Sequence, residues 1–382
     1  MAAPIILTPF VRGVKEFQQL GLMNKAVLDA TAVDIPVIGL SKNQTERKER
    51  FLRQALILVI AFLFAPIHGK LISQFLSKRI GFRSAQANQI LMQIPYGQLV
   101  NAKTLKNGIR QLLSSHAVSA RLSQTVLSRA NEALRLRVVK AKTAFLMADM
   151  VVCGLLMCSI GYIKVLFGKF LSGKSQFTGE QGIVSEQSLD KLYEKDASFE
   201  RQKKIKTMLT FGLGVGVPIT LGLLLRNVLK ISNPRGLASF VATKVGPWLD
   251  YNYPQYLKKL RGWPLLSDGA QIVLSALLTT GELASARSKR ELKELAIQRN
   301  SIDALFFFGT PMLMKALSGS TTVQGAIDRV TSRRPKLVRA AASRAAKTYL
   351  LSYTLASLAV AGIILWTNKM TRKAVQDEAK QL

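Results

Sequence analysis

Four residues of this 382-residue chain match a phosphate-binding motif. Gly168, Gly173, Lys174 and Ser175 fit the spacing G-x-x-x-x-G-K-[ST] of the P-loop. In a P-loop, backbone N–H groups, the lysine and the hydroxyl hold phosphates and Mg²⁺, and the motif lies between a strand and a helix. Here an apolar run of helix length precedes the motif and QFTGEQG follows it. We therefore expect an incidental match at the exit of a helix, and we predict no cofactor.

One acidic residue, Asp149, lies inside the otherwise uncharged run 143–163. An ionisable group inside a membrane is costly, and it is by default a candidate for proton or cation handling. Lys142 is only two helical turns away, so Asp149 would also fit a position near the membrane interface. The sequence leaves both interpretations open.

The residue types that most often catalyse reactions or bind metals are scarce. His68 and His116 are the only histidines, and Cys153 and Cys158 are the only cysteines. The two cysteines are five residues apart, share no helix face and fit no metal spacing, and no zincin, nucleophile-elbow or thiol-redox motif occurs. We therefore predict no catalytic and no metal-binding residues and lean against an enzyme.

Three long apolar runs define the elements that would position these residues. They are 143–163, 207–225 and 348–368, and basic residues flank each of them. At the rise of an α-helix the nineteen residues of the second run cover roughly 28 Å, close to the hydrocarbon thickness of a bilayer. The sequence thus predicts an all-α integral membrane protein with three strong spans. The alternative is a set of buried helices in a soluble protein.

The run 207–225 carries a predicted packing face. Gly212 and Gly216 stand four residues apart, on one side of the helix, where a second backbone can approach closely. Pro218 removes one backbone hydrogen bond, and a packed neighbour can replace it. We expect these three residues to face another helix.

Three shorter apolar stretches would raise the number of spans to as many as six. They are 54–69, 269–281 and 304–314. Each is shorter than the roughly 20 residues of an ordinary span, so we expect buried, re-entrant or interfacial helices. The first stretch would either span with snorkelling flanks or turn back at Pro66.

The charge balance calls for an anionic partner. The chain has 54 Lys and Arg against 22 Asp and Glu, a net charge of +32. Nucleic acid and anionic lipid are the two candidates. The apolar runs favour lipid, and no zinc-finger, helix-turn-helix or aromatic-basic strand signature supports nucleic acid.

Residues 70–142 hold thirteen Lys or Arg and a single acid, Glu132, and their apolar residues recur at helical spacing. Basic amphipathic helices of this kind lie on anionic membrane surfaces. The competing interpretation is a set of helices that pack on one another with solvated basic faces. The predicted lipid-surface residues are Lys103, Lys106, Arg110, Arg121, Arg129, Arg135 and Arg137.

Composition divides the chain into five regions. In order, they are a mixed region, a short apolar segment with basic amphipathic helices, a two-span hairpin, a proline- and aromatic-rich region with short apolar helices, and a final span with a charged tail. Their bounds are 1–53, 54–142, 143–225, 226–347 and 348–382. AKTAFL at 141–146 is echoed by AKTYLL at 346–351, which raises the hypothesis of a duplicated hairpin.

Counting basic residues predicts a topology. Three spans place 41 of the 54 Lys and Arg on one side and 13 on the other, a fourth span at 54–69 gives 33 against 21, and six spans give 28 against 26. The positive-inside rule therefore prefers three spans with a cytoplasmic N-terminus. The N-terminal residues have no basic region before their apolar patch, so we predict no signal peptide and expect a bacterial inner membrane.

These observations predict a non-enzymatic membrane protein whose cationic face organises an anionic membrane or recruits partners, either another protein or a second copy of the chain. The alternative is a six-span transporter or channel for a small solute, including an anionic one. An internal repeat or a polar cavity would favour the transporter. Closely packed spans with a broad cationic face would favour the first function.

Overall fold

A computed structural model describes residues 9–11, 13–14, 26–27, 29–115, 119–196, 199, 202–253, 262–332 and 338–382. Within these ranges the regular structure is helical, and the only extended pairing is an isolated bridge between Asn252 and Leu265. This confirms the predicted all-α class for the described part of the chain. The chain forms two compact units, described separately: unit 1 (1–58, 160–207 and 279–382) and unit 2 (59–159 and 208–278).

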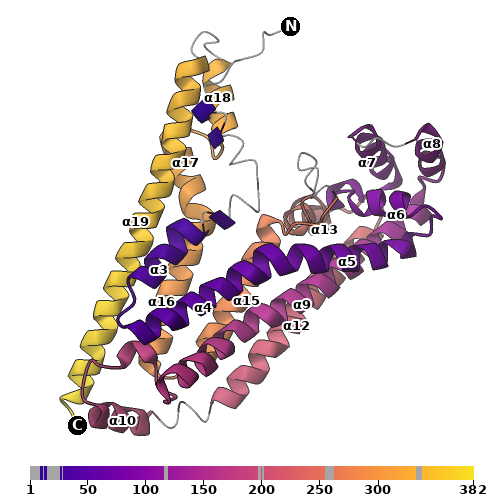
Figure 1. The fold of residues 1–382 in the computed structure, drawn as a ribbon. Helices are drawn as coiled ribbons and strands as arrows, with labels where there is room; N and C mark the ends of the chain where they lie inside the picture. The colour runs from indigo at the N-terminus through magenta and orange to yellow at the C-terminus, as the bar shows by residue number, and fades with distance from the viewer. Residues whose placement is uncertain are drawn as a thin grey trace. The chain divides into compact units, whose positions relative to one another are not determined.

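The helices follow one another along the whole chain (Figure 1). The first half contains η1 (Asp29–Asp34), α3 (Ile35–Gly39), α4 (Gln44–Leu58), η2 (Val59–Phe64), α5 (Ala65–Ser77), η3 (Lys78–Ile80), α6 (Ala85–Met92), η4 (Tyr96–Gln98), α7 (Ala102–Ser115), α8 (Ala120–Ser128) and α9 (Glu132–Ser172). The second half contains η5 (Thr178–Glu180), α10 (Glu186–Lys195), α12 (Lys203–Lys230), α13 (Gly236–Phe240), η6 (Val241–Val245), α14 (Gly246–Leu249), α15 (Asp268–Ser285), α16 (Lys289–Ala304), η8 (Leu305–Gly309), α17 (Thr310–Ser318), α18 (Val323–Thr331) and α19 (Val338–Ala379).

In the described part of the chain, four helical segments are long and apolar enough to cross a membrane: Gln44–Ile80, Glu132–Ser172, Lys203–Lys230 and Val338–Ala379. Only 22–44% of their most apolar windows is buried inside the protein, so large apolar side chains remain exposed along them. Leu209 and Leu358, for example, are each 63% exposed. Apolar surface of this extent is unfavourable in water and natural in lipid.

The predicted three strong runs fall inside three of these segments, and the short stretch 54–69 falls inside the fourth. Its helix continues through Pro66 to Ser77, which excludes one of the two predicted alternatives, the turn back at Pro66, and leaves the other, a span with snorkelling flanks. The other two short stretches lie in α15 and in η8–α17. Between α15 and α16, buried Ser288 donates a hydrogen bond to Glu180 at 3.0 Å, within unit 1. The three-span topology puts these two residues on opposite sides of the membrane, and so does a topology in which only the four candidate segments span; this contact contradicts both.

Four π-helical segments each lie directly before a proline. They are η1, η2, η6 and η8, and the prolines are Pro36, Pro66, Pro247 and Pro311. Proline lacks an N–H donor, and its ring collides with the carbonyl four residues earlier in a regular α-helix. A wider π turn at that place relieves the collision. The helix therefore continues past the proline.

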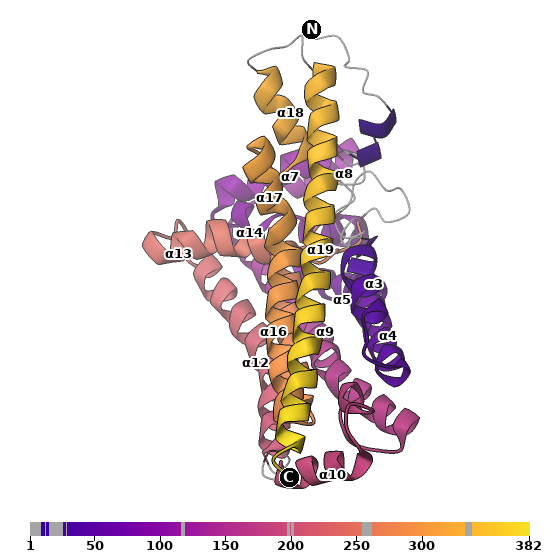
Figure 2. The same ribbon diagram turned by 90° about the vertical axis from the view of Figure 1, so that its left-hand side faces the viewer.

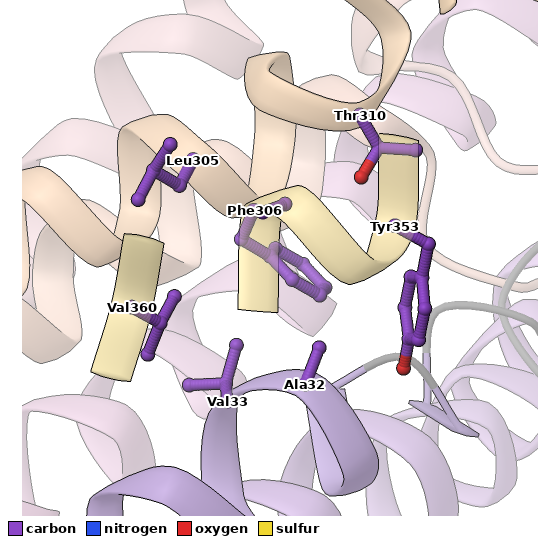
Figure 3. Close-up of a pocket in the computed structure, with 8 residues that line it drawn as sticks. Ala32, Val33, Leu305, Phe306, Thr310, Tyr353 and Val360 are labelled. Carbon is purple, nitrogen blue, oxygen red and sulfur yellow. The ribbon is translucent and has the colours of Figure 1, made fainter. Parts of the chain in front are cut away.

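In unit 1, α16, α17 and α18 lie along α19 (Figure 2). Small side chains on one side of α19, including Ala342, Ala345 and Ala346, let α17 and α18 approach. Beside them, η1, η8 and α19 enclose an apolar crevice lined by Val33, Phe306 and others (Figure 3). At about 20 Å³ the crevice is too small for a solute larger than water.

In unit 2, α12 packs on α9 through a face that differs from the predicted one. Gly212 and Gly216 are exposed, and a Cβ added to either would meet nothing within 4 Å. The buried face carries Gly214, Pro218 and Gly222 instead. A Cβ on Gly154 of α9 would lie 3.0 Å from the Gly214 carbonyl oxygen, so the two backbones meet there. The predicted close helix contact exists and Pro218 belongs to it, but the two predicted glycines do not.

Candidate functional site: buried ionisable groups and a basic surface

Asp149 is fully buried on α9 in unit 2, and both of its carboxylate oxygens have a polar partner. The Tyr251 hydroxyl donates to Oδ2 at 2.6 Å, and His68 Nδ1 lies 2.9 Å from Oδ1. Phe64 stacks on the His68 ring with 5.1 Å between ring centroids. The carboxylate therefore lies in the middle of a hydrogen-bonded chain of three titratable groups. Such a chain can accept, hold and pass on a proton.

A second buried carboxylate, Asp250, adjoins this centre. The Lys142 ammonium lies 2.8 Å from Oδ1, and the backbone N–H groups of Tyr96 and Tyr251 donate to the carboxylate at 2.9 Å and 2.8 Å. Burial raises the pKa of Asp250, and the Lys142 charge and the two N–H groups only partly oppose that rise. Lys142 itself is fully buried, although the sequence places it as a flanking charge of the span.

His68, Asp149 and Cys153 have ligand atoms within 4.8 Å of one another. Imidazole, carboxylate and thiolate are all ligands of zinc-type ions. Because both oxygens of Asp149 already have partners, an ion there would displace the contact to His68 or to Tyr251. Proton exchange is therefore the simpler chemistry for this group, and the absence of a metal site stays a prediction.

A polar cavity of about 370 Å³ lies beside Tyr251 in unit 2. Among the described residues that line it, amide side chains and tyrosine rings dominate, and none is charged. The lining residues are Gln93, Pro95, Gln98, Gln111, Leu112, Tyr251, Asn252 and Tyr253. Its size is at the lower end of small-molecule sites, and amides offer both donors and acceptors.

Unit 1 buries a larger set of charges along α4 and α16 and in the segments that contact them. Its buried charged residues in this region are Glu46, Glu49, Arg50, Arg53, Lys164, Glu180, Glu282, Arg287, Arg290, Glu291, Glu294 and Arg299. Carboxylates and cations alternate in contact. Burial by itself would raise the pKa of Glu291, but Arg287 and Lys164 bring it down to about 2.

The predicted lipid-surface residues separate into two groups. Lys103, Lys106, Arg110, Arg121, Arg129 and Arg137 are exposed on α7, α8 and α9 or directly beside them. On the apolar face of α7, Leu105 and Ile109 are fully buried within the protein, and Leu112 and Leu113 are partly buried. These helices therefore pack on the protein and present basic side chains outward. This matches the competing interpretation from the sequence, and the basic faces stay available to a partner.

Arg135 does not belong to that surface, because it is fully buried. Its guanidinium donates to the carbonyl oxygens of Leu99 at 2.7 Å and Lys230 at 3.2 Å, and also to that of Leu229. The last two carbonyls end α12, where the helix leaves acceptors without intrahelical donors. Glu132 completes the contact as an ion pair. Arg135 is thus a structural cap of α12.

The segment α13–η6–α14 has two different faces. Leu237, Phe240 and Trp248 are 79%, 56% and 44% exposed, while Val241 and Leu249 on the opposite face are buried. In Figure 2 the segment lies across the end of α12, to which a short turn connects it. Exposed aromatic and apolar side chains at the end of a helix long enough to cross a membrane suit the headgroup layer.

The P-loop match lies at the C-terminal end of α9, in unit 1. Gly173 has φ +68° and its N–H donates to the Lys169 carbonyl at 2.8 Å, as in a helix C-cap. Lys174 pairs with Glu186 at 3.1 Å, and no helix begins at the motif. Together with the preceding helix, this geometry agrees with an incidental match.

The sequence interpretation missed Tyr251, Asp250 and the buried charges of unit 1. The sequence does indicate part of the charged group in unit 1, because Asn43-x-x-Glu46 and Ser288-x-x-Glu291 both have the spacing of a capping box at a helix N-terminus. Comparison with protein-family models, curated proteins and solved structures finds no match. Function must therefore be argued from the residues themselves.

Proposed function

We propose that this is a non-enzymatic integral membrane protein whose unit 2 gathers anionic lipid headgroups on a basic surface, and so organises the membrane around it or recruits partners to it. The proposed location is a bacterial inner membrane. A protein partner, or a second copy of the chain, would then bind to the lipid-covered face. The four apolar helical segments support the membrane location.

The observation that carries the proposal is the one-sided charge of unit 2. Its sequence holds twenty Lys or Arg and four acids. Asp149 and Asp250 are buried, and Glu132 is paired with Arg135, so Asp268 is the one exposed acid among them. The exposed cations therefore have almost no acidic neighbours to neutralise them. Anionic headgroups attract such cations by about 1 kcal/mol each.

The exposed cations gather at one end of three apolar helices. Lys78 follows the apolar part of α5, Arg137 and Lys140 precede that of α9, and Lys230 and Arg235 follow that of α12. Helix α5 runs antiparallel to α9, because His68 meets Asp149 while Gly81, after α5, lies beside Arg137. Helix α12 is also antiparallel to α9, because Gly222 meets Met147 while Leu229 meets Arg135. These cations therefore meet one membrane interface.

The α13–η6–α14 segment offers a probe of this interface. Trp248 lies on its exposed face, close to η4, because Gly97 of η4 and Pro247 are neighbours. The exposed cations of α7 and of the segment itself, Lys103, Lys106, Arg235 and Lys244, surround this part of unit 2.

The test uses full-length protein in lipid nanodiscs, with Trp263 and Trp366 replaced by phenylalanine so that Trp248 is the only tryptophan. Brominated phosphatidylglycerol should quench Trp248 more strongly than brominated phosphatidylcholine at equal mole fraction, and salt should reduce the difference. Replacing Lys103, Lys106, Arg235 and Lys244 by glutamine should abolish it. Neutralising the exposed unit 1 residues Lys169, Lys191 and Lys195 is the matched control. Equal quenching by both lipids would refute the proposal.

Proton-linked transport of a small solute is the second candidate, because of Asp149. A buried carboxylate between His68 and Tyr251, next to a polar cavity of about 370 Å³, is the type of centre that couples protons to solutes. Proteoliposomes containing a pH-sensitive dye would test it by proton entry under an imposed gradient. Asp149→Asn should abolish that entry, whereas Asp268→Asn at an exposed site should not. Equal proton entry for wild type and Asp149→Asn would reject this candidate.

A further inference from the structure

Two stretches of the sequence correspond at a constant separation of 245 residues. They are 41–73 and 286–318. Identical residues fall at eight positions, and both stretches read from charged residues through an apolar run to a proline. The identical pairs are Glu46/Glu291, Lys48/Lys293, Glu49/Glu294, Ile57/Ile302, Phe62/Phe307, Pro66/Pro311, Lys70/Lys315 and Ser73/Ser318.

The same separation relates their helices. Helix α4 begins at Gln44 and α16 begins at Lys289, while α5 begins at Ala65 and α17 at Thr310. A π segment lies between the two helices in both stretches. Farther on, at a different separation of 205 residues, the echo AKTAFL/AKTYLL lies in α9 and α19, helices of 41 and 42 residues. The correspondence thus covers helix starts, the π turn, the proline and the long helix that follows.

The N-terminal ends of α4 and α16, both in unit 1, make the same set of capping hydrogen bonds. Asn43 Oδ1 accepts from the Glu46 N–H at 2.8 Å, and Ser288 Oγ accepts from the Glu291 N–H at 3.0 Å. Each glutamate then turns back: Glu46 accepts from the Lys42 N–H, and Glu291 accepts from the Arg287 N–H, both at 2.6 Å. These are two capping boxes with the same reach.

Ion pairs then join the two ends reciprocally. Lys42 bonds Glu294 at 2.6 Å, and its counterpart Arg287 bonds Glu49, the counterpart of Glu294, at 2.8 Å. All four side chains are at most 4% exposed. The Phe177 ring lies between them, 4.6 Å from Lys42 Nζ and 5.2 Å from Arg287 Cζ. Exchanging the two stretches leaves this pattern of contacts unchanged.

A contact pattern that survives such an exchange is the mark of an isologous interface, in which one surface binds a copy of itself. Capping boxes are common, but they give no reason for each cation to bind the carboxylate of the other helix. Burying four charges is costly unless every charge is paired, and here the reciprocal geometry pairs each of them. We propose that 41–73 and 286–318 are two copies of one helical module, joined at their capped ends by an interface of homodimer type.

The test is a set of double-mutant cycles on the full chain in neutral nanodiscs, read as the midpoint of thermal unfolding. Lys42→Met with Glu294→Gln, and Arg287→Met with Glu49→Gln, should each show coupling: the double variant should lose clearly less than the sum of its two singles. The two couplings should be similar in size. The crossed combinations, Lys42→Met with Glu49→Gln and Arg287→Met with Glu294→Gln, should couple less. The exposed pair Lys174–Glu186 should show no coupling and serves as the control.

An exchange variant keeps the proposal testable if a neutralised variant fails to fold. It combines Lys42→Arg with Arg287→Lys, and Asn43→Ser with Ser288→Asn, so that each copy receives the residues of the other. Equivalent copies predict an unfolding midpoint within a few degrees of wild type. A large loss of stability in the exchange variant, or coupling in only one of the two reciprocal pairs, would overturn the duplicated interface.

Discussion

Arg135 and Arg137 stand two residues apart on α9 and should respond to substitution in opposite ways. Arg135 is fully buried and donates to three carbonyl oxygens, of which those of Leu99 and Leu229 belong to fully buried residues. Arg135→Gln shortens the side chain and leaves these acceptors without a donor. Each unsatisfied buried acceptor costs about 1–3 kcal/mol, so we expect a loss of about 3 kcal/mol. For a chain of 382 residues, with an unfolding entropy of about 2.1 cal/mol/K per residue, that corresponds to a midpoint lower by about 4 °C.

Arg137 is exposed, so Arg137→Gln should change stability by less than about 0.5 kcal/mol. If Arg137 belongs to the lipid-binding surface, its loss should weaken attraction to anionic lipid by about 1 kcal/mol, which is about fivefold. Thermal unfolding in neutral nanodiscs measures the first effect, and quenching of Trp248 by brominated phosphatidylglycerol measures the second. An Arg135→Gln protein of wild-type stability that binds less anionic lipid would refute the assignment of Arg135 as a cap.

Three further predictions follow from contacts of single residues. Gly154→Ala should destabilise the protein by about 1–3 kcal/mol, because the new Cβ would lie 2.9 Å from a Leu277 methyl and 3.0 Å from the Gly214 carbonyl oxygen. Gly216→Ala is the control, because a Cβ there would meet nothing within 4 Å, and it should leave the unfolding midpoint unchanged. Equal midpoints for the two variants would be inconsistent with the observed packing face. The pKa of Glu291 is lowered from 4.5 to about 2, so its stabilisation is complete above pH 4.5 and is lost as the pH falls toward 2. Glu291→Gln should reduce the fall in the free energy of unfolding between pH 4.5 and pH 2 by up to about 3 kcal/mol. An unchanged fall over this pH range would exclude the ion pair of Glu291 as its cause. In a variant without Cys153 and Cys158, the thiols introduced by Ser188→Cys and by Lys289→Cys should be labelled from the same side of the membrane, because the Ser288–Glu180 hydrogen bond joins the two segments that carry them; labelling from opposite sides would restore the three-span topology.

Features set by the local sequence were predictable. The apolar runs 143–163, 207–225 and 348–368 all lie in helices of spanning length, because length and hydropathy are properties of one segment. The stretch 54–69 was underestimated because its polar flanks hide how far the helix extends. A turn back of the chain at Pro66 was one of the two predicted alternatives, but a π turn before the proline lets the helix continue.

Features set by a distant neighbour were not predictable. Gly212 and Gly214 have the same local chemistry, and only the position of α9 decides which glycine is buried. Arg135 shares the charge and spacing of the exposed arginines, but the end of α12 makes it a buried cap. Amphipathic periodicity predicts that one face of a helix is buried, but it does not indicate whether lipid or protein covers that face.

The two groups of buried acids also differ in a way that bears on function. In unit 1 the buried carboxylates Glu49, Glu291 and Glu294 each contact cations, so protonating one of them would leave a buried positive charge without its partner. Asp149 in unit 2 instead receives a phenol hydroxyl from Tyr251 and shares a hydrogen bond with His68, whose ring can take up the proton that the carboxylate releases. A proton can therefore move within this group without creating an unpaired charge. The contacts of Asp149 therefore suit the proposed proton exchange, whereas the unit 1 carboxylates pair with cations and hold helices together.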